Sequence, residues 1–403
     1  MLNWLKQFGI FCLLDNHHYG IQPHTMEWQV AVDANEFVSG DEIGAVDQFI
    51  KESGWAFGHL SYELLHSSFK LPTTKKDSVD FPPFYFFRPR IVLEYNEELK
   101  IYAENPVQVF QSIMETDALV DALSAVSCHL TPVLSKEEYI EKVKLLQEHI
   151  HRGDCYEVNF CQEFFAQNCT IDPFSCFQKL MNLSPNPFSA FYRLNDKFLL
   201  CASPERFLVK REGRVFSQPI KGTSKRDLQS SKADEQLRQD LLQSQKEQSE
   251  NVMVVDLVRN DLTKICKEAS VKVDELFGIY SFPQVHQMIS TISGELKEDI
   301  SFSQIVEATF PMGSMTGAPK RRVMQLIDQY EPSIRGIFSG SVGYFNPAGD
   351  FDFNVVIRSM MYNSTQEYLS YQVGSGITFY SDAEKEWEEC MLKAEAIKQV
   401  LTF

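Results

Sequence analysis

The sequence predicts an α+β protein built on large, mainly antiparallel β-sheets. Predicted helices at 231–258, 319–330 and 382–401 separate only some of the predicted strands, so the order lacks the regular strand–helix alternation of a doubly wound parallel sheet. The first hundred residues are also rich in aromatic and strand-forming side chains. The predicted strands lie at 155–166, 188–194, 197–203, 270–280, 337–345, 353–362 and 367–374.

The N-terminal third adds a hairpin and a connector. Residues 84–94 and 99–103 alternate as strands do and flank the polar residues 95–98, which predicts a β-hairpin. Residues 104–134 are predicted to be a helical connector. We therefore expect a strand-rich N-terminal subdomain with its connector over 1–134.

A helix start marks the second region. Ser135 and Glu138 have the spacing of a capping box, and Gly153 is placed to end the helix that follows. We expect residues 135–403 to form the catalytic region. The two regions are expected to share one integrated fold rather than to form separate domains.

Composition restricts the class of protein. With 403 residues, 44% hydrophobic and 12% aromatic, the chain can bury a large core. The apolar run 10–14 is far too short to span a membrane, and no secretory signal is visible. The nine cysteines are odd in number and form no Cys-x-x-Cys pair, which argues against a disulfide framework and a zinc site. We expect free, buried cysteines in a reducing cytoplasm.

The net charge of −17 makes nucleic acid an improbable partner. An anionic small molecule would also be repelled by the whole protein. A site for one must therefore concentrate positive charge locally, from Lys, Arg, a helix N-terminus or a metal ion.

Two pairs of glutamates predict a cation site. Glu247 and Glu250 share one face of a predicted helix, and Glu386 and Glu389 have the same spacing near the C-terminus. The alternative for the first pair is a surface acidic patch. For the second pair it is the acidic first turn of a helix that Ser381 would cap. If the two pairs met, they would repel each other unless a cation lay between them, and oxygen-only ligands suit Mg²⁺.

Two further segments offer positive charge. The run 313–320, Gly-Ser-Met-Thr-Gly-Ala-Pro-Lys, lacks the spacing of a phosphate loop, but the helix N-terminus there, with Lys320 and Arg321, forms a credible anion site. An ordinary helix entry with exposed basic residues is the alternative. Arg358 ends the apolar strand 353–357, where its guanidinium could hold a carboxylate with two hydrogen bonds.

Several motifs occur together in a fixed order, and this set resembles the chorismate-binding enzymes, which include anthranilate, isochorismate, salicylate and aminodeoxychorismate synthases. The resemblance is specific over roughly residues 135–403 and loose before them. Within the family, a lysine in the run 219–223 resembles the aminodeoxychorismate synthase branch, whereas anthranilate synthases have alanine there. The motifs are Ser-Pro-Glu-Arg-Phe at 203–207, Pro-Ile-Lys-Gly-Thr at 219–223, the run 250–262, Gly-Ser-Met-Thr-Gly-Ala-Pro-Lys at 313–320, Asp-Phe-Asn-Val-Val-Ile-Arg at 352–358, Gly-Ser-Gly at 374–376 and Glu-Trp-Glu-Glu-Cys at 386–390.

The resemblance implies a fold of two large β-sheets packed face to face with helices outside. It also implies that Glu250 and Glu389 bind Mg²⁺, with Glu247 and Glu386 nearby or acting through water. Chorismate itself would be bound by a set of residues that includes the anion-binding candidates above. These are Gly222, Ser314, Lys320, Tyr344, Arg358, Gly374 and Gly376.

The chemistry implied by the resemblance depends on Lys221 and Glu205. Glu205 would protonate the departing C4 hydroxyl of chorismate if burial raises its pKa; a salt bridge to Arg206 or another neighbour is the alternative. Lys221 would add at C2, and ammonia would then enter at C4 and release it, giving 4-amino-4-deoxychorismate for p-aminobenzoate and folate synthesis. Lys221 can attack only as a neutral amine, a state that burial near cations favours.

The sequence also departs from the family pattern. The family's catalytic histidine aligns with Gln287, and His286 lies one position early, on the opposite face of a strand. Gly-Asp-Cys-Tyr-Glu at 153–157 is not a glutaminase nucleophile turn, so the resemblance implies a separate glutamine amidotransferase subunit that supplies ammonia.

Other functions remain open at this point. Anthranilate synthase component I is the first alternative; Lys221 and the absence of a Leu-Leu-Glu-Ser signature argue against it. An isochorismate or salicylate synthase is the next. A catalytically idle partner of an amidotransferase is the non-enzymatic alternative, and it would have no need of Glu205, Lys221 and the glutamate pairs.

Overall fold

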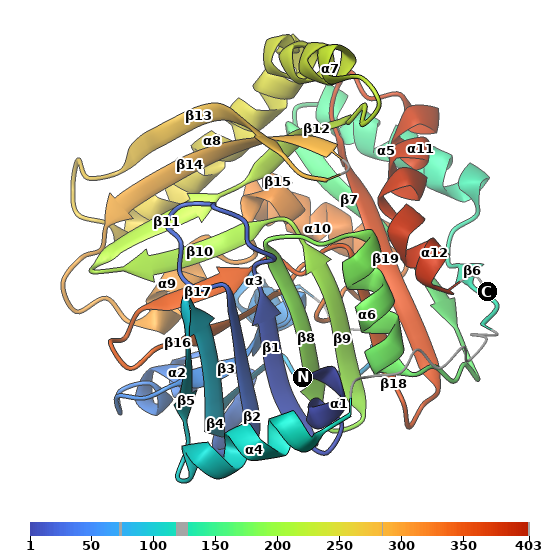
Figure 1. Ribbon diagram of the computed structural model, residues 1–403. Coiled ribbons are helices and arrows are strands. Elements are labelled where there is room, and N and C mark those ends of the chain that lie inside the picture. Colours follow the sequence, from blue (N-terminus) through green and yellow to red (C-terminus); the bar gives the residue numbers. More distant parts are fainter. Residues whose placement is uncertain (72–74, 118–127, 284, 402–403) are drawn as a thin grey trace.

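The computed structural model describes residues 1–71, 75–117, 128–283 and 285–401 (Figure 1). Its strands pair only in antiparallel ladders within these residues. The strands are β1 Ile10–Asp15, β2 Trp28–Gly40, β3 Ala56–Leu60, β4 Phe84–Asn96, β5 Glu98–Tyr102, β6 Thr131–Pro132, β7 Glu157–Ala166, β8 Phe188–Leu194, β9 Lys197–Ser203, β10 Arg206–Arg211, β11 Arg214–Gln218, β12 Ile220–Lys225, β13 Lys272–Ser281, β14 Val285–Glu295, β15 Gly317–Ala318, β16 Ser341–Phe345, β17 Phe351–Asn354, β18 Ser359–Asn363 and β19 Tyr368–Ile377.

Helices lie between many of these strands, in no regular alternation. The helices are α1 Leu2–Leu5, α2 Gly44–Phe49, α3 His66–Phe69, α4 Pro106–Glu115, α5 Lys136–His151, α6 Pro173–Leu183, α7 Ser231–Gln243, α8 Gln245–Ile265, α9 Phe302–Thr309, α10 Lys320–Tyr330, α11 Ala383–Lys393 and α12 Glu395–Leu401, with 3₁₀ turns η1 Tyr62–Leu65 and η2 Gly313–Met315.

The predicted α+β class with large antiparallel sheets is confirmed, and the two sheets are joined. Hydrogen-bonded ladders run without a break through β13, β14, β11, β10, β17, β16, β3, β4, β2, β1, β8, β9, β18, β19 and β7. In Figure 1 the strands from β13 to β10 run across the view, whereas β1 to β4, β8 and β9 run upright. The change of direction corresponds to the two predicted sheets.

Strands from both sequence regions share this sheet. β1 pairs with β8, and β3 pairs with β16, so N-terminal strands lie between strands that come from beyond residue 135. The N-terminal region therefore contributes to the framework that positions the rest of the chain.

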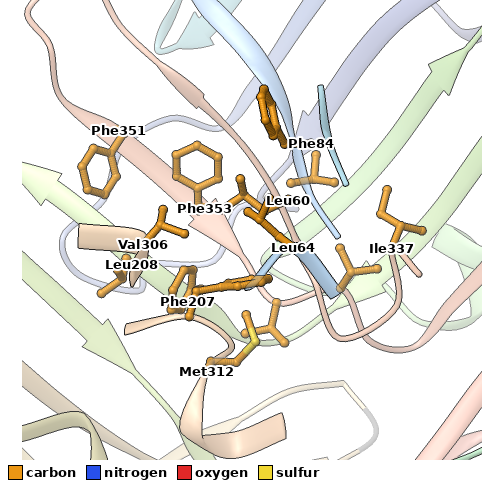
Figure 2. Packing of buried hydrophobic residues seen from close by; sticks show 14 of the residues in the cluster. Leu60, Leu64, Phe84, Phe207, Leu208, Val306, Met312, Ile337, Phe351 and Phe353 are labelled. Atoms are coloured by element: carbon orange, nitrogen blue, oxygen red, sulfur yellow. The ribbon is translucent and has the colours of Figure 1, made fainter. Parts of the chain in front are cut away.

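The hydrophobic core brings together segments that are far apart in the sequence. Figure 2 shows Leu60 and Phe84 from β3 and β4 near Phe353 of β17, with Phe207 of β10 and Val306 of α9 close by. Each large apolar side chain buried in this way contributes about 1.5–3 kcal/mol. This packing fixes β10 and β17, whose ends continue into the segments that carry Glu205 and Arg358.

Several local predictions are confirmed. β4 and β5 form the predicted hairpin, although their strands extend further and turn tightly at Glu97, which has a φ of 67°. Ser135 and Glu138 form the predicted capping box at the start of α5. Gly153, with a φ of 82°, follows the end of that helix. In the connector, α4 is helical, and residues 118–127 lie outside the described part.

Other local predictions are wrong in detail. The helix predicted over 231–258 is divided at Ser244, whose side chain accepts a hydrogen bond from Glu247 N and so begins α8 as a separate helix. Asp382, not Ser381, caps α11 by accepting bonds from the next turn. The strand predicted over 353–362 is interrupted before Arg358, whose φ of 54° is left-handed. α6 and α9 were not predicted.

The cysteine prediction needs one correction. Cys128 and Cys169 form a disulfide with Cα atoms 5.4 Å apart, whereas the other seven cysteines are free and buried. As to the membrane, none of the helices in the described ranges combines the length and apolar character that a transmembrane span needs.

Candidate active site

Lys221 lies near the start of β12, where a register shift between Ile220 and Thr223 lets the strand bulge out of its pairing with β14. Its ammonium group forms an ion pair with Glu157 Oε1, from the first residue of β7. Only 11% of the Lys221 side chain and 4% of the Glu157 side chain are exposed. This pair is the centre of the candidate site, and Figure 1 shows β12, β7 and β19 meeting below α7.

The charges around Lys221 correct one prediction. Burial alone lowers the pKa of Lys221, but the negative charges of Glu157, Glu250 and Glu389 outweigh burial and raise that pKa above its usual value. The sequence suggested that neighbouring cations would keep Lys221 neutral. Instead its neighbours are carboxylates, and the resting lysine is an ammonium.

Gly376 of β19 gives this pair its space. A Cβ atom at Gly376 would lie 2.7 Å from both Lys221 Nζ and Glu157 Oε1. Gly374, two residues earlier, faces the same way along the strand, and its carbonyl accepts a hydrogen bond from Lys393 Nζ at 2.8 Å. Gly222, with a φ of 99°, leaves similar room for the Glu247 side chain. Gly376 and Gly222 therefore lie where site side chains approach the backbone closely, whereas a Cβ atom at Gly374 would meet Cys161 Sγ and the Phe160 carbonyl of β7.

Glu205 has the environment of a proton donor. It is 4% exposed and lies between β9 and β10. Burial raises the pKa of Glu205 to about 7, against the opposing effects of Ser314 and the charges of Lys221 and Lys393. Ser314 Oγ is buried close to this carboxyl yet makes no hydrogen bond of good geometry, so it is available to a ligand. The salt bridge from Glu205 to Arg206 does not form, since Arg206 pairs with Asp352.

The four predicted metal ligands lie on α8 and α11, where burial and the charges of neighbouring glutamates raise the pKa values of three of them. Burial, together with repulsion from Glu389 and Glu386, raises the pKa of Glu247. Burial and the charge of Glu389 likewise raise the pKa of Glu386. Burial raises the pKa of Glu250 to about 7. The charges of the two glutamate pairs therefore act on one another from α8 and α11.

Lysines neutralise part of this negative charge. Lys393 forms an ion pair with Glu389 at 2.7 Å and, despite burial, lowers the pKa of that carboxyl. Lys246 lies 3.8 Å from Glu250.

Within the described ranges no three acidic, histidine or cysteine side chains converge tightly enough to be a preassembled metal centre. The donor set still fits Mg²⁺, because it consists of carboxylates whose mutual repulsion a divalent cation would relieve.

Arg358 brings a positive charge without a partner. Burial lowers the pKa of its guanidinium, while the charge of Glu389 opposes this effect. No ion pair or hydrogen bond of this side chain occurs within the described part of the chain, although Arg358 is only partly exposed. Its left-handed backbone is the kind of strain that persists at functional positions. Arg358 is thus available to bind an anion.

Two predicted residues are not part of this group. Lys320 Nζ binds Asp261 at 2.6 Å and the Thr309 carbonyl at 3.0 Å, so its charge stabilises the junction of α8, α9 and α10. Tyr344 packs its ring on Trp55 and Phe57. Burial raises the pKa of Tyr344, and the charge of Asp352 adds to this effect. The roles of Lys320 and Tyr344 as chorismate ligands stay predictions.

Sequence reasoning missed two site residues. Glu157 is the first residue of β7, a strand that also contains Asn159, Gln162 and Glu163, so no local signal distinguished it. Lys393 lies four residues after Glu389 on one helix face, the spacing of an ion pair.

His286 binds Ser281 and Asp234, at 2.8 and 3.0 Å, and so anchors α7. Gln287 is buried, and its Oε1 has no hydrogen-bond partner.

The sequence matches a known family and several named relatives. Residues 20–399 match the family described as chorismate binding enzyme. An anthranilate synthase component I-like protein of Synechocystis is 35% identical over 86% of this chain and 72% of its own length. Aminodeoxychorismate synthase component 1 of Klebsiella aerogenes is 34% identical over 85% of this chain and 76% of its own length. That of Escherichia coli is 40% identical over 66% of this chain and 58% of its own.

Solved structures agree on the fold. The crystal structure of anthranilate synthase component I from Streptococcus pneumoniae has a TM-score of 0.81 at 23% identity, covering 95% of this chain and 94% of that one. The menaquinone-specific isochorismate synthase of Escherichia coli has a TM-score of 0.79 at 18% identity, covering 100% of this chain and 91% of that one. The chain belongs to the chorismate binding enzyme family.

Proposed function

We propose that this protein aminates chorismate at C4, giving 4-amino-4-deoxychorismate. The observation that carries the proposal is the buried Lys221, paired with Glu157 and close enough to Glu205 for its charge to affect the pKa of that acid. A buried amine beside a protonated acid is what a substitution through a covalent intermediate requires. The relatives named aminodeoxychorismate synthase component 1 support the same reaction.

The proposed steps balance as follows. Glu205 gives its proton to the C4 hydroxyl, the C4–O bond breaks, and water leaves. The Lys221 amine forms a bond to C2 as the ring double bonds shift, and its extra proton passes to a base. Ammonia then forms a bond to C4 and gives its extra proton to the Glu205 carboxylate, the double bonds shift back, and the C2–N bond to Lys221 breaks as the base returns its proton to the leaving amine. No net oxidation or reduction occurs.

The remaining residues are assigned to binding. Arg358 binds a substrate carboxylate, because its guanidinium is unpaired and can offer two parallel N–H donors. Ser314 Oγ, buried close to the Glu205 carboxyl, would contact the substrate ring. Gly374 and Gly376 let the ligand approach the backbone of β19. These contacts provide the local positive charge and polar groups that a protein of net charge −17 needs to bind a dianion.

We assign Mg²⁺ binding to Glu250 and Glu389, with Glu247 and Glu386 beside them. When bound, the ion would link these carboxylates to a carboxylate of the substrate and offset their repulsion. Glu250→Gln and Glu389→Gln should each weaken Mg²⁺ binding in calorimetric titration and abolish turnover without lowering the melting temperature. Glu298→Gln, at an exposed position, serves as the control. Full activity in excess chelator would contradict the assignment.

The ammonia source is assigned to a separate glutamine amidotransferase subunit, since the relatives are named as one component of an enzyme. We place the reaction in p-aminobenzoate and folate formation in the cytoplasm. Seven of the nine cysteines are free, as in proteins of a reducing compartment, whereas Cys128 and Cys169 form a disulfide.

Anthranilate synthesis is the second candidate, because the relative from Synechocystis carries that name. Mass spectrometry and chromatography of the product formed from chorismate, ammonium and Mg²⁺ separate the two. The proposal predicts 4-amino-4-deoxychorismate. Anthranilate as the main product would overturn it.

A further inference from the structure

The ammonium group of Lys221 has to lose a proton before it can attack carbon, and the structure shows which group touches it. Glu157 Oε1 is the ion-pair partner of Lys221 Nζ, and no other carboxylate within the described ranges lies in ion-pair range of that nitrogen. Glu205, Glu250 and Glu389 act on it from farther away. The proton thus has one direct acceptor.

We propose that Glu157 is the proton acceptor that converts Lys221 into a free amine before it attacks the substrate. The inference rests on the proposed function, because it assigns a role within the covalent route through Lys221. In the step, an N–H bond of the ammonium breaks and an O–H bond forms on Glu157. One positive and one negative charge disappear together, and no other reactant is needed.

The position of Glu157 suits this role. It begins β7, paired with Ala318 on one side, and the missing side chain of Gly376 lets its carboxylate and the lysine lie together against β19. The pair is shielded from solvent, since only 11% of the Lys221 side chain and 4% of the Glu157 side chain are exposed. A closed ion pair inside the protein can therefore exchange its proton without solvent.

The second oxygen of the same carboxylate is an independent observation. Glu157 Oε2 is buried and has no hydrogen-bond partner. A buried carboxylate used only as a structural clamp is normally satisfied at both oxygens. The unpaired oxygen leaves Glu157 with capacity to hold the proton while Oε1 still contacts the lysine.

A purely structural role predicts the opposite behaviour. If Glu157 only held Lys221 in place as an ammonium, removing its charge would release a more easily deprotonated amine, and the rate would be kept or would rise. If Glu157 accepts the proton, removing its charge leaves the ammonium without a direct acceptor. The sign of the rate change therefore distinguishes the two roles.

The experiment compares Glu157→Gln, Glu157→Asp and the matched control Glu163→Gln in the full-length protein. Glu163 is a partly buried glutamate on the same strand whose contact with Tyr368 a glutamine can keep. Steady-state rates are measured with chorismate, ammonium and Mg²⁺, and folding is followed by thermal unfolding. We expect kcat to fall at least about 100-fold in Glu157→Gln with KM changed less than about threefold. Glu157→Asp should recover part of the rate, and Glu163→Gln should match the unsubstituted protein.

A Glu157→Gln rate equal to or above that of the unsubstituted protein would overturn the inference. If this variant does not fold, Glu157→Asp decides alone: a lower kcat at preserved KM supports the role, and an unchanged or higher kcat excludes it. Product identity separates the two proposals. If the unsubstituted protein makes no aminodeoxychorismate, the proposed function fails; if it does and Glu157→Gln is fully active, only the proton-acceptor role fails.

Discussion

Arg358 carries a positive charge in a partly buried position without an ion-pair partner among the residues that the structure describes. Arg358→Lys keeps the charge but loses the planar fork that can bind a carboxylate through two hydrogen bonds. We expect KM for chorismate to rise at least tenfold, about 1.4 kcal/mol, with a smaller effect on kcat. Arg259→Lys, at an exposed ion pair on α8, is the control for a lysine replacement. An unchanged KM would mean that Arg358 is structural.

Glu205 predicts how activity depends on pH. Burial raises its pKa to about 7, so the carboxyl is protonated below that value and loses its proton above it. Because the proposed acid acts in its protonated form, kcat/KM should decline as pH rises through about 7. Deprotonation of Glu250 over the same range would favour cation binding and act in the opposite direction, so Mg²⁺ is kept saturating.

Glu205→Gln supplies the check on that assignment. The variant should lose at least about 100-fold in kcat, as expected for loss of a general acid. Its residual rate should no longer decline near pH 7. A decline that persists in the variant would assign the pH dependence to another group.

At the scale of elements, β19 is the strand on which the site depends most. A side chain at Gly376 would overlap Lys221 Nζ and Glu157 Oε1, each 2.7 Å from the added atom. Gly376→Ala should therefore reduce turnover by at least about 100-fold while the protein stays folded, because the polar ends of two side chains must move rather than the core. Gly44→Ala, where nothing lies within 4 Å, is the control. Near-normal activity of Gly376→Ala would show that the ion pair does not need its present position.

Element prediction succeeded where local pattern and structure agree. The capping box at Ser135 and the hairpin of β4 and β5 are determined by neighbouring residues and were predicted. The division of the helix at Ser244 was not, because a serine inside a polar helical run gives only a weak signal. The interruption before Arg358 was missed for a related reason, since Val355, Val356 and Ile357 suit a strand and only tertiary contacts end it.

At the scale of the whole molecule, the fold class could be predicted, but the joining of the sheet could not. The strand content excluded a doubly wound fold, whereas the ladder between β3 and β16 joins residues nearly three hundred positions apart and leaves no local signal. The same limit applies to the site. Spacing on one helix identified each glutamate pair, but only the fold shows that the charges of the two pairs act on each other and on Lys221.

Family resemblance explains the rest of the site prediction. Motifs singled out Lys221, Glu205 and Ser314, and in the structure Ser314 and the charge of Lys221 both act on the Glu205 carboxyl. Lys320 and Tyr344 were also in or near motifs, but a motif does not show which way a side chain points. Lys320 pairs with Asp261, and Tyr344 packs on aromatic rings, so both stabilise the fold around the site.

The central claim is that Lys221 forms a bond to C2 of chorismate, and product analysis of Lys221→Ala tests it most directly. The variant removes the amine and leaves Glu205, Arg358 and the glutamate pairs in place. Products from chorismate, ammonium and Mg²⁺ are separated and identified by mass against synthetic standards. We predict that aminodeoxychorismate formation falls at least about 1,000-fold, as deletion of a nucleophile requires, and that the trace product shifts toward the 2-amino isomer or anthranilate. Aminodeoxychorismate formed by Lys221→Ala at the unsubstituted rate would contradict the claim.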